Sequence, residues 1–148
     1  MHASVYQAIA ISLGLGLLVG LQREWKESEI AGIRTFPLIT MLGTVTMLLS
    51  ETTSGWVIAA GLLSIAAMLL IGNLAKLRAG KFDPGLTTEA AALLMFGVGA
   101  IVGAGYTGPG VVTTGIVAVL LHWKRPLHGF VDRIGERDIR GVIHLVLI

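Results

Sequence analysis

Residues 14–37 have the sequence GLGLLVGLQREWKESEIAGIRTFP, which runs from Gly14 to Pro37. The stretch begins as a glycine-rich apolar helix and becomes charged at Gln22-Arg23-Glu24. It returns to apolar sequence after Arg34-Thr35. Two arginines and a glutamate therefore stand where one apolar helix ends and the next begins. This junction could serve as a binding site, as a structural anchor, or as both.

The composition around this junction is that of an integral membrane protein. Of the 148 residues, 54% are hydrophobic and only 14% are charged, and the mean hydropathy is +0.81. A soluble domain has about 25% charged residues, so this chain has too few to cover a globular surface. The absence of cysteine excludes disulfides, a thiol nucleophile and a thiolate metal site.

Apolar segments predict an all-α, polytopic transmembrane bundle of about five spans. The expected spans are Ala3–Leu21, Leu38–Leu49, Trp56–Leu74, Leu86–Tyr106 and Val111–Trp123. The second reaches a spanning length only if it begins near Ile33, with Pro37 in its first turns. The fifth is short even when it is counted from Pro109. Residues 1–22 contain no Lys or Arg, so the first segment is not a signal peptide.

All 11 Lys and Arg residues lie on one side of these spans. They are Arg23, Lys26 and Arg34 after the first span, Lys76, Arg78 and Lys81 after the third, and Lys124, Arg125, Arg133, Arg137 and Arg140 after the fifth. Basic residues concentrate on the cytoplasmic side of membrane proteins. The pattern predicts an outside N-terminus and an inside C-terminus. Trp25, Trp56 and Trp123 each fall at an expected helix end, which is typical of the membrane interface.

The sequence divides into a transmembrane domain, 1–123, and a tail, 124–148. Leu127, Val131 and Ile134 recur at helical spacing between charged residues, which favours an amphipathic helix on the membrane surface. A solvated linker is the alternative. The apolar residues 141–148 resemble the start of a further helix, so we expect the chain to be part of a longer protein.

Two glycine patterns lie inside apolar segments. Gly16 and Gly20 share the first span, and Gly99 and Gly103 share the fourth. A dinucleotide-binding loop is excluded because it needs a strand–turn–helix context. In lipid, glycines four residues apart let helices pack closely, so these four are candidate helix-packing residues. The two patterns run in opposite directions, as an inverted repeat would, although glycine is common in membrane helices.

Glu89 is the most informative single residue, because ionisable groups inside spans usually face a cavity, a partner or an ion path. The alternative is a helix-capping role, with Thr87 or Thr88 as the N-cap and Glu89 in the first turn. The expected topology places it near both arginines of the first junction. Such a cluster could hold an ion, bind an anionic ligand or neutralise itself. The candidate ligand or ion site comprises Arg23, Glu24, Arg34, Thr35, Thr88 and Glu89.

The remaining polar residues indicate packing rather than chemistry. Thr40, Thr44, Thr46 and Asn73 are expected to hydrogen-bond across helices. The four histidines lack metal-ligand spacing, so no metal is assigned. No catalytic triad, carboxylate pair or phosphate loop is present in the sequence. We therefore expect no enzymatic activity, no cofactor and no nucleic-acid partner.

The segment Gly20-Leu21-Gln22-Arg23-Glu24, followed by Ala31-Gly32-Ile33-Arg34-Thr35, resembles the hallmark GLxRE…AGLRT of the MgtC/SapB family. Leu86-Thr87-Thr88-Glu89-Ala90 and the glycines Gly97, Gly99, Gly103 and Gly105 resemble its later conserved helix. The resemblance covers about residues 5–122, and the tail resembles the linker of a longer branch that carries a second membrane domain.

The resemblance implies a multi-pass protein of a bacterial or archaeal inner membrane, linked to magnesium limitation or cation homeostasis. Its partners would be the lipid bilayer, an inorganic ion, a second copy in a dimer, and another membrane protein. Two hypotheses follow. One is an ion channel or transporter-like domain. The other is a regulatory or assembly subunit that docks through Gly16, Gly20, Gly99 and Gly103.

Overall fold

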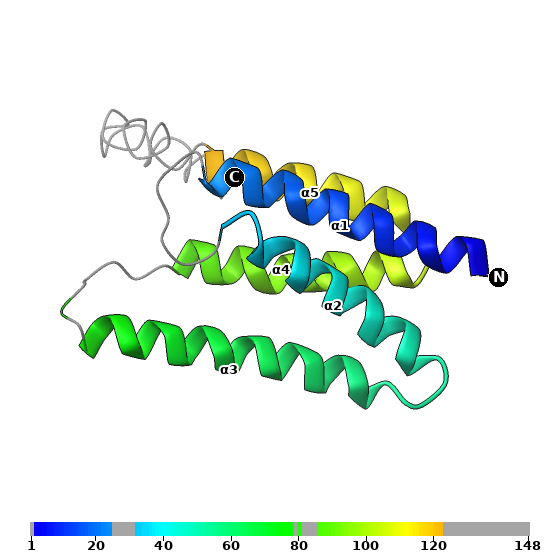
Figure 1. The fold of residues 1–148 in the computed structure, drawn as a ribbon, viewed down its shortest axis with the longest axis horizontal. Coiled ribbons are helices and arrows are strands. Elements are labelled where there is room, and N and C mark those ends of the chain that lie inside the picture. Colours follow the sequence, from blue (N-terminus) through cyan, green and yellow to red (C-terminus); the bar gives the residue numbers. More distant parts are fainter. Residues whose placement is uncertain (1, 25–31, 79, 81–85, 123–148) are drawn as a thin grey trace, which may run out of the picture.

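The computed structural model describes residues 2–24, 32–78, 80 and 86–122. In these residues the chain forms α-helices and no strand, which confirms the all-helical prediction (Figure 1). The helices are α1 (His2–Glu24), α2 (Thr35–Ser50), α3 (Trp56–Arg78), α4 (Leu86–Gly103) and α5 (Thr107–His122). The predicted tail helix, and the tryptophans at 25 and 123, lie outside the described residues. Trp56 is the first residue of α3, as predicted.

Two helices begin at positions other than those predicted. Helix α2 begins at Thr35, before the predicted Leu38 and close to Ile33, and α5 begins at Thr107, before the predicted Val111 or Pro109. Each has proline as its third residue, where the missing N–H would have had no partner within the helix. Both helices have 16 residues. This gives a length of about 24 Å, short of the roughly 30 Å of bilayer hydrocarbon.

Helix α4 ends at Gly103, before the predicted Tyr106. The reason is a Schellman motif at its C-terminus. The Tyr106 N–H donates to the Ile101 carbonyl, and the Gly105 N–H donates to the Val102 carbonyl, both at 3.0 Å. Gly105 has φ +90°, a conformation that glycine adopts without a steric penalty. The motif turns the chain sharply from α4 into α5.

Successive helices alternate in direction, so α2 and α4 run parallel to each other and antiparallel to the rest (Figure 1). Helices α1, α2, α4 and α5 form a four-helix group in which α2 and α4 share the largest interface. Helix α3 lies outside this group and, among the described helices, contacts only α2 and α4. The α2–α4 pair is therefore the centre of the fold.

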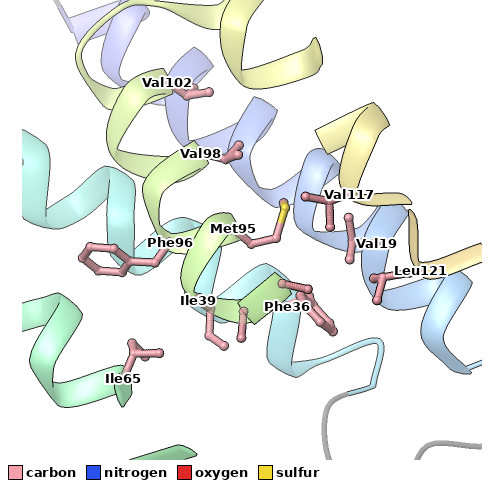
Figure 2. Close-up of a cluster of buried hydrophobic side chains, with 12 residues drawn as sticks. Val19, Phe36, Ile39, Ile65, Met95, Phe96, Val98, Val102, Val117 and Leu121 are labelled. Atoms are coloured by element: carbon pink, nitrogen blue, oxygen red, sulfur yellow. The ribbon is translucent and has the colours of Figure 1, made fainter. Parts of the chain in front are cut away.

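The core fills the four-helix group. Val19, Phe36 and Met95 are fully buried there, and the side chain of Met95 extends toward Val19 and Val117 (Figure 2). Helix α3 contributes only Ile65 as a buried residue. The outer surface carries exposed leucines, isoleucines and valines on every helix. Such a surface suits lipid rather than water.

Three of the described helices are long and apolar enough to cross a membrane. They correspond to residues Ser4–Arg23, Trp56–Arg78 and Leu86–Gly103. Helices α2 and α5 are apolar but shorter. A helical membrane bundle is therefore the architecture of this chain. Its two shorter helices, α2 and α5, pack against longer neighbours.

Candidate functional site

Two glycines of α1 and two of α4 pack against α2 or the turn before it. A Cβ atom added to Gly16 would lie 2.5 Å from the Cα of Pro37, and one added to Gly20 would lie 2.9 Å from the Cα of Ile33. Gly14, by contrast, faces open space. The first glycine pair therefore packs α1 against the start of α2 and the turn before it.

Farther along α2, glycines of α2 and α4 bring the backbones of these two helices into contact. A Cβ on Gly99 would overlap the carbonyl oxygen of Thr40, and a Cβ on Gly43 would overlap that of Phe96. A Cβ on Gly103 would lie 3.0 Å from the Thr44 carbonyl oxygen. All four candidate packing glycines thus meet α2 or the turn before it. They pack the chain's own helices.

A buried hydrogen-bond chain crosses the same three helices. The hydroxyl of Ser12 in α1 lies 2.5 Å from the hydroxyl of Thr44 in α2. The Thr44 hydroxyl also lies 2.9 Å from the Gly99 carbonyl oxygen in α4. A direction that satisfies both contacts has Ser12 donating to Thr44 and Thr44 donating to Gly99. Thr44 therefore links α1, α2 and α4 at the centre of the bundle.

The other buried threonines behave differently. Thr40 donates to the carbonyl oxygen of Phe36 at 2.8 Å, and Thr46 donates to those of Leu42 and Gly43 at 2.9 Å. These bonds stay within one helix, as is common for threonine in apolar helices. Of the residues expected to hydrogen-bond across helices, Thr44 is the one that bonds to other helices in the described part of the structure.

The first part of the candidate ion site lies where α1 ends and α2 begins. Arg23 is half-buried in the last turn of α1, and its Nε atom is shielded from solvent. Glu24 is the last residue of α1, but its side chain lies outside the described part of the structure. Arg34 occupies the N-cap position of α2 with an exposed side chain, and half-buried Thr35 begins that helix.

The second part lies in the first turn of α4. Thr88 is buried and Glu89 is half-buried. The helix begins at Leu86, so Thr87 and Thr88 lie inside it, and the prediction that one of them is the N-cap is wrong. Glu89 remains in the first turn, where the helix dipole favours a carboxylate. The dipole therefore stabilises the carboxylate at this position.

The structure brings all six candidate residues to the same end of the bundle, because α1 ends where α2 and α4 begin (Figure 1). The described side chains of Arg34 and Glu89 do not form an ion pair with each other. No group of three or more His, Asp or Glu side chains that could hold a metal ion occurs in the described residues. The ligand or ion site remains a prediction.

Two residues at the contacts among α1, α2 and α4 were not singled out from the sequence. Gly43 is a lone glycine in the second span, and its signal was its position beside Thr44. Ser12 is a small polar residue in an apolar helix, a common pattern at membrane helix contacts. Neither signal indicates which neighbouring helix is contacted.

Comparison with known proteins gives one finding. The model of the MgtC family matches residues 9–130 of this chain, which is well over half of its length. The matched range includes the charged junction, the four packing glycines and Glu89. No curated protein and no solved structure matches the chain.

Proposed function

Because the chain belongs to the MgtC family, we propose that it is an ion channel or transporter-like membrane domain linked to magnesium or cation homeostasis. No chemical reaction and no cofactor is part of this proposal. The ion would meet the protein at the end of the bundle that carries Arg23, Arg34 and Glu89.

The observation that carries the proposal is the position of Glu89. Glu89 is a half-buried residue in the first turn of an apolar helix. It also lies at the same end as two arginines whose side chains differ in burial, Arg23 half-buried and Arg34 exposed. An ionisable group at such a position usually faces a partner, a cavity or an ion path. A carboxylate is also a preferred ligand of hard divalent cations.

Charge supports an orientation in which this end faces the cytoplasm. The described basic residues Arg23, Arg34, Lys76 and Arg78 all lie at this end of their helices. The opposite end carries Glu51 at the C-cap of α2. Positive residues favour the cytoplasmic side. The N-terminus would then lie outside, and the chain would cross a bacterial or archaeal inner membrane several times.

Ion flux in proteoliposomes tests the proposal. Vesicles that contain the wild-type chain should take up Mg²⁺, or Na⁺ or K⁺, faster than empty vesicles. Glu89→Gln should reduce the flux several-fold because the carboxylate is lost while the side-chain shape is kept. Glu51→Gln is the matched control: it removes an exposed carboxylate at the opposite end and should leave the flux unchanged. Equal flux in the wild type and in Glu89→Gln, or none above empty vesicles, would reject the proposal.

The second candidate function is a regulatory or assembly subunit that docks on another membrane protein. A partner that docked through Gly16, Gly20, Gly99 or Gly103 would have to displace α2, because α2 or the turn before it meets all four. Small residues that do have open space beside them include Gly14, Gly97 and Gly115. A partner, or a second copy in a dimer, would fit those positions better. Leucine at Gly14 or Gly97 should then reduce recovery of the partner or of the dimer from membranes, and unchanged recovery would count against this function.

A further inference from the structure

Helix α3 docks on the bundle along one stripe of residues. The stripe contains Ile58, Gly61, Ile65 and Leu69, and its three hydrophobic side chains belong to or pack against the core. A Cβ on Gly61 would lie 2.9 Å from the Cγ2 of Thr46 in α2 and 3.1 Å from the Cζ of Phe96 in α4. The stripe therefore defines the face of α3 that is turned toward α2 and α4.

The same face becomes polar toward the end of α3. Lys76 follows Ile58 by 18 residues, which is five turns of about 3.6 residues, so both point in the same direction. Gly72 and Asn73 lie beside this line, and all three residues are half-buried. A side chain added at Gly72 would meet open space. The last turns of α3 thus direct a lysine and an asparagine toward the bundle without tight packing.

Helix α4 presents Glu89 on the stripe that faces α3. Phe96 meets Gly61 of α3, and partly buried Leu93 packs against the core. Glu89 precedes these two residues by seven and four positions, so it lies on the same side of α4. Glu89 is half-buried there, whereas Leu86 and Ala90 are exposed. The carboxylate and the lysine therefore belong to two facing surfaces.

The Lys76 and Glu89 side chains lean toward each other along the axis of the bundle. Measured from the Gly61–Phe96 contact, Lys76 lies about 22 Å along α3 and Glu89 about 10 Å along α4, at ~1.5 Å per residue. The axial offset is about 12 Å by the same rise. Side chains lean toward the N-terminus of their helix. Because α3 and α4 are antiparallel, Lys76 leans toward Glu89 and Glu89 leans toward Lys76.

We propose that the end of α3 closes on α4 and that the Lys76 ammonium then pairs with the Glu89 carboxylate, with the Asn73 amide as a second donor. In the structure described here the Lys76 and Glu89 side chains are not paired, so it represents the open arrangement. The movement leaves α3 intact. A membrane helix satisfies its own backbone hydrogen bonds, so it can shift against its neighbours without unfolding.

Several features make α3 the helix that moves. It contributes one buried residue, Ile65, and its docking stripe ends at Leu69, two turns before its C-terminus. The α1, α2 and α4 helices are instead joined by the Ser12–Thr44–Gly99 hydrogen bonds and by backbone contacts at glycine. The pairing goes beyond the proposed function and does not depend on it, because closure can occur whether or not the domain conducts ions.

Distances between spin labels test the closure. The chain has no cysteine, so labels can be placed in the full chain at chosen pairs of positions. Cysteines at the exposed positions Leu38 and Leu77 report on the separation of α2 from the end of α3. Cysteines at Leu38 and Leu94 report on the α2–α4 pair and verify that the bundle is folded. Electron paramagnetic resonance in lipid nanodiscs gives the distance distribution of each pair.

The wild type should show a short-distance population for the 38–77 pair. Lys76→Met and Glu89→Gln should each shift this population to longer distances, and the double variant should shift it no further. Exchanging the charges, with Lys76→Glu and Glu89→Lys together, should restore it. Arg78→Met is the matched control, because it removes a charge from the same helix end on the exposed face.

The proposal is overturned if Lys76→Met leaves the 38–77 distances unchanged. It is also overturned if Arg78→Met shifts them as much, which would show a general effect of surface charge. Additive shifts in the double variant would show that the two residues act separately. If the charge exchange does not fold, as judged by the 38–94 pair, the single and double variants still decide the question.

Discussion

The hydroxyl oxygens of Ser12 and Thr44 lie 2.5 Å apart between α1 and α2, and both residues are fully buried. Neither water nor lipid can supply a hydrogen bond at this position. A buried hydroxyl without a partner costs free energy, so each of these groups needs the other or a backbone carbonyl. Thr44 meets this need with Ser12 on one side and Gly99 on the other.

Thr44→Val should therefore destabilise the bundle. The substitution keeps the β-branched shape and removes the hydroxyl that two helices share. We expect the free energy of unfolding to fall by about 1–2 kcal/mol, near the upper end measured for hydrogen bonds between membrane helices. Titration with SDS from mild detergent, followed by circular dichroism, measures the change. Thr46→Val, whose hydroxyl bonds only to its own helix, should cost less.

A double-mutant cycle isolates the contact itself. Ser12→Ala and Thr44→Val together should cost less than the sum of the two single changes, because either one breaks the same bond. A cycle in which the two effects add would show that the hydroxyls contribute independently of each other.

Gly99→Ala should be strongly destabilising, and Gly97→Ala should not. The added methyl group at Gly99 would overlap the carbonyl oxygen of Thr40, so α2 and α4 must separate. We expect a loss of about 1–3 kcal/mol, the usual cost of forcing an extra group into a packed interface. At Gly97 there is open space, and alanine is the better helix former. Thermal unfolding in detergent compares the two variants directly, and equal midpoints would contradict the close α2–α4 contact.

Labelling from each side of the membrane tests the orientation. Single cysteines at Ser54 and Tyr106 lie at one end of the bundle, and a cysteine at Arg78 lies at the other. A membrane-impermeant maleimide added to intact cells should label the first two. It should label Arg78→Cys only after the cells are opened. Labelling of all three from outside would exclude an arrangement in which the helices cross the membrane in turn.

The sequence was sufficient to predict which segments form helices. Apolar length predicted the five helices, and Leu86 and Trp56 were correct first residues. The errors fell at helix ends. Helix α5, for example, begins with Thr107 and Gly108, before its apolar segment. Hydropathy does not register these residues as helical, because it measures affinity for lipid and not backbone hydrogen bonding. The Schellman turn at Gly105 ended α4 for a similarly local reason.

The candidate site could be predicted only in part from the sequence. The charges of Arg23, Arg34 and Glu89 predicted a common end of the bundle, and the helix directions agree with this. Sequence spacing could not show that Glu89 lies on the α4 stripe that faces α3. That relation depends on how α4 is rotated about its axis, and the rotation is set by the contacts of Gly99 and Phe96 with other helices.

The sequence by itself determined that this chain is a helical membrane bundle, because apolar length and charge position are properties of each segment alone. Gly16, Gly20, Gly99 and Gly103 were also recognisable as packing residues from their four-residue spacing. Only the tertiary structure decided that all four meet α2 or the turn before it, that Gly43 completes the contact, and that Thr44 joins three helices. The physical reason is that helix packing in lipid depends on the fit of two surfaces, and the sequence of one helix does not specify its neighbour.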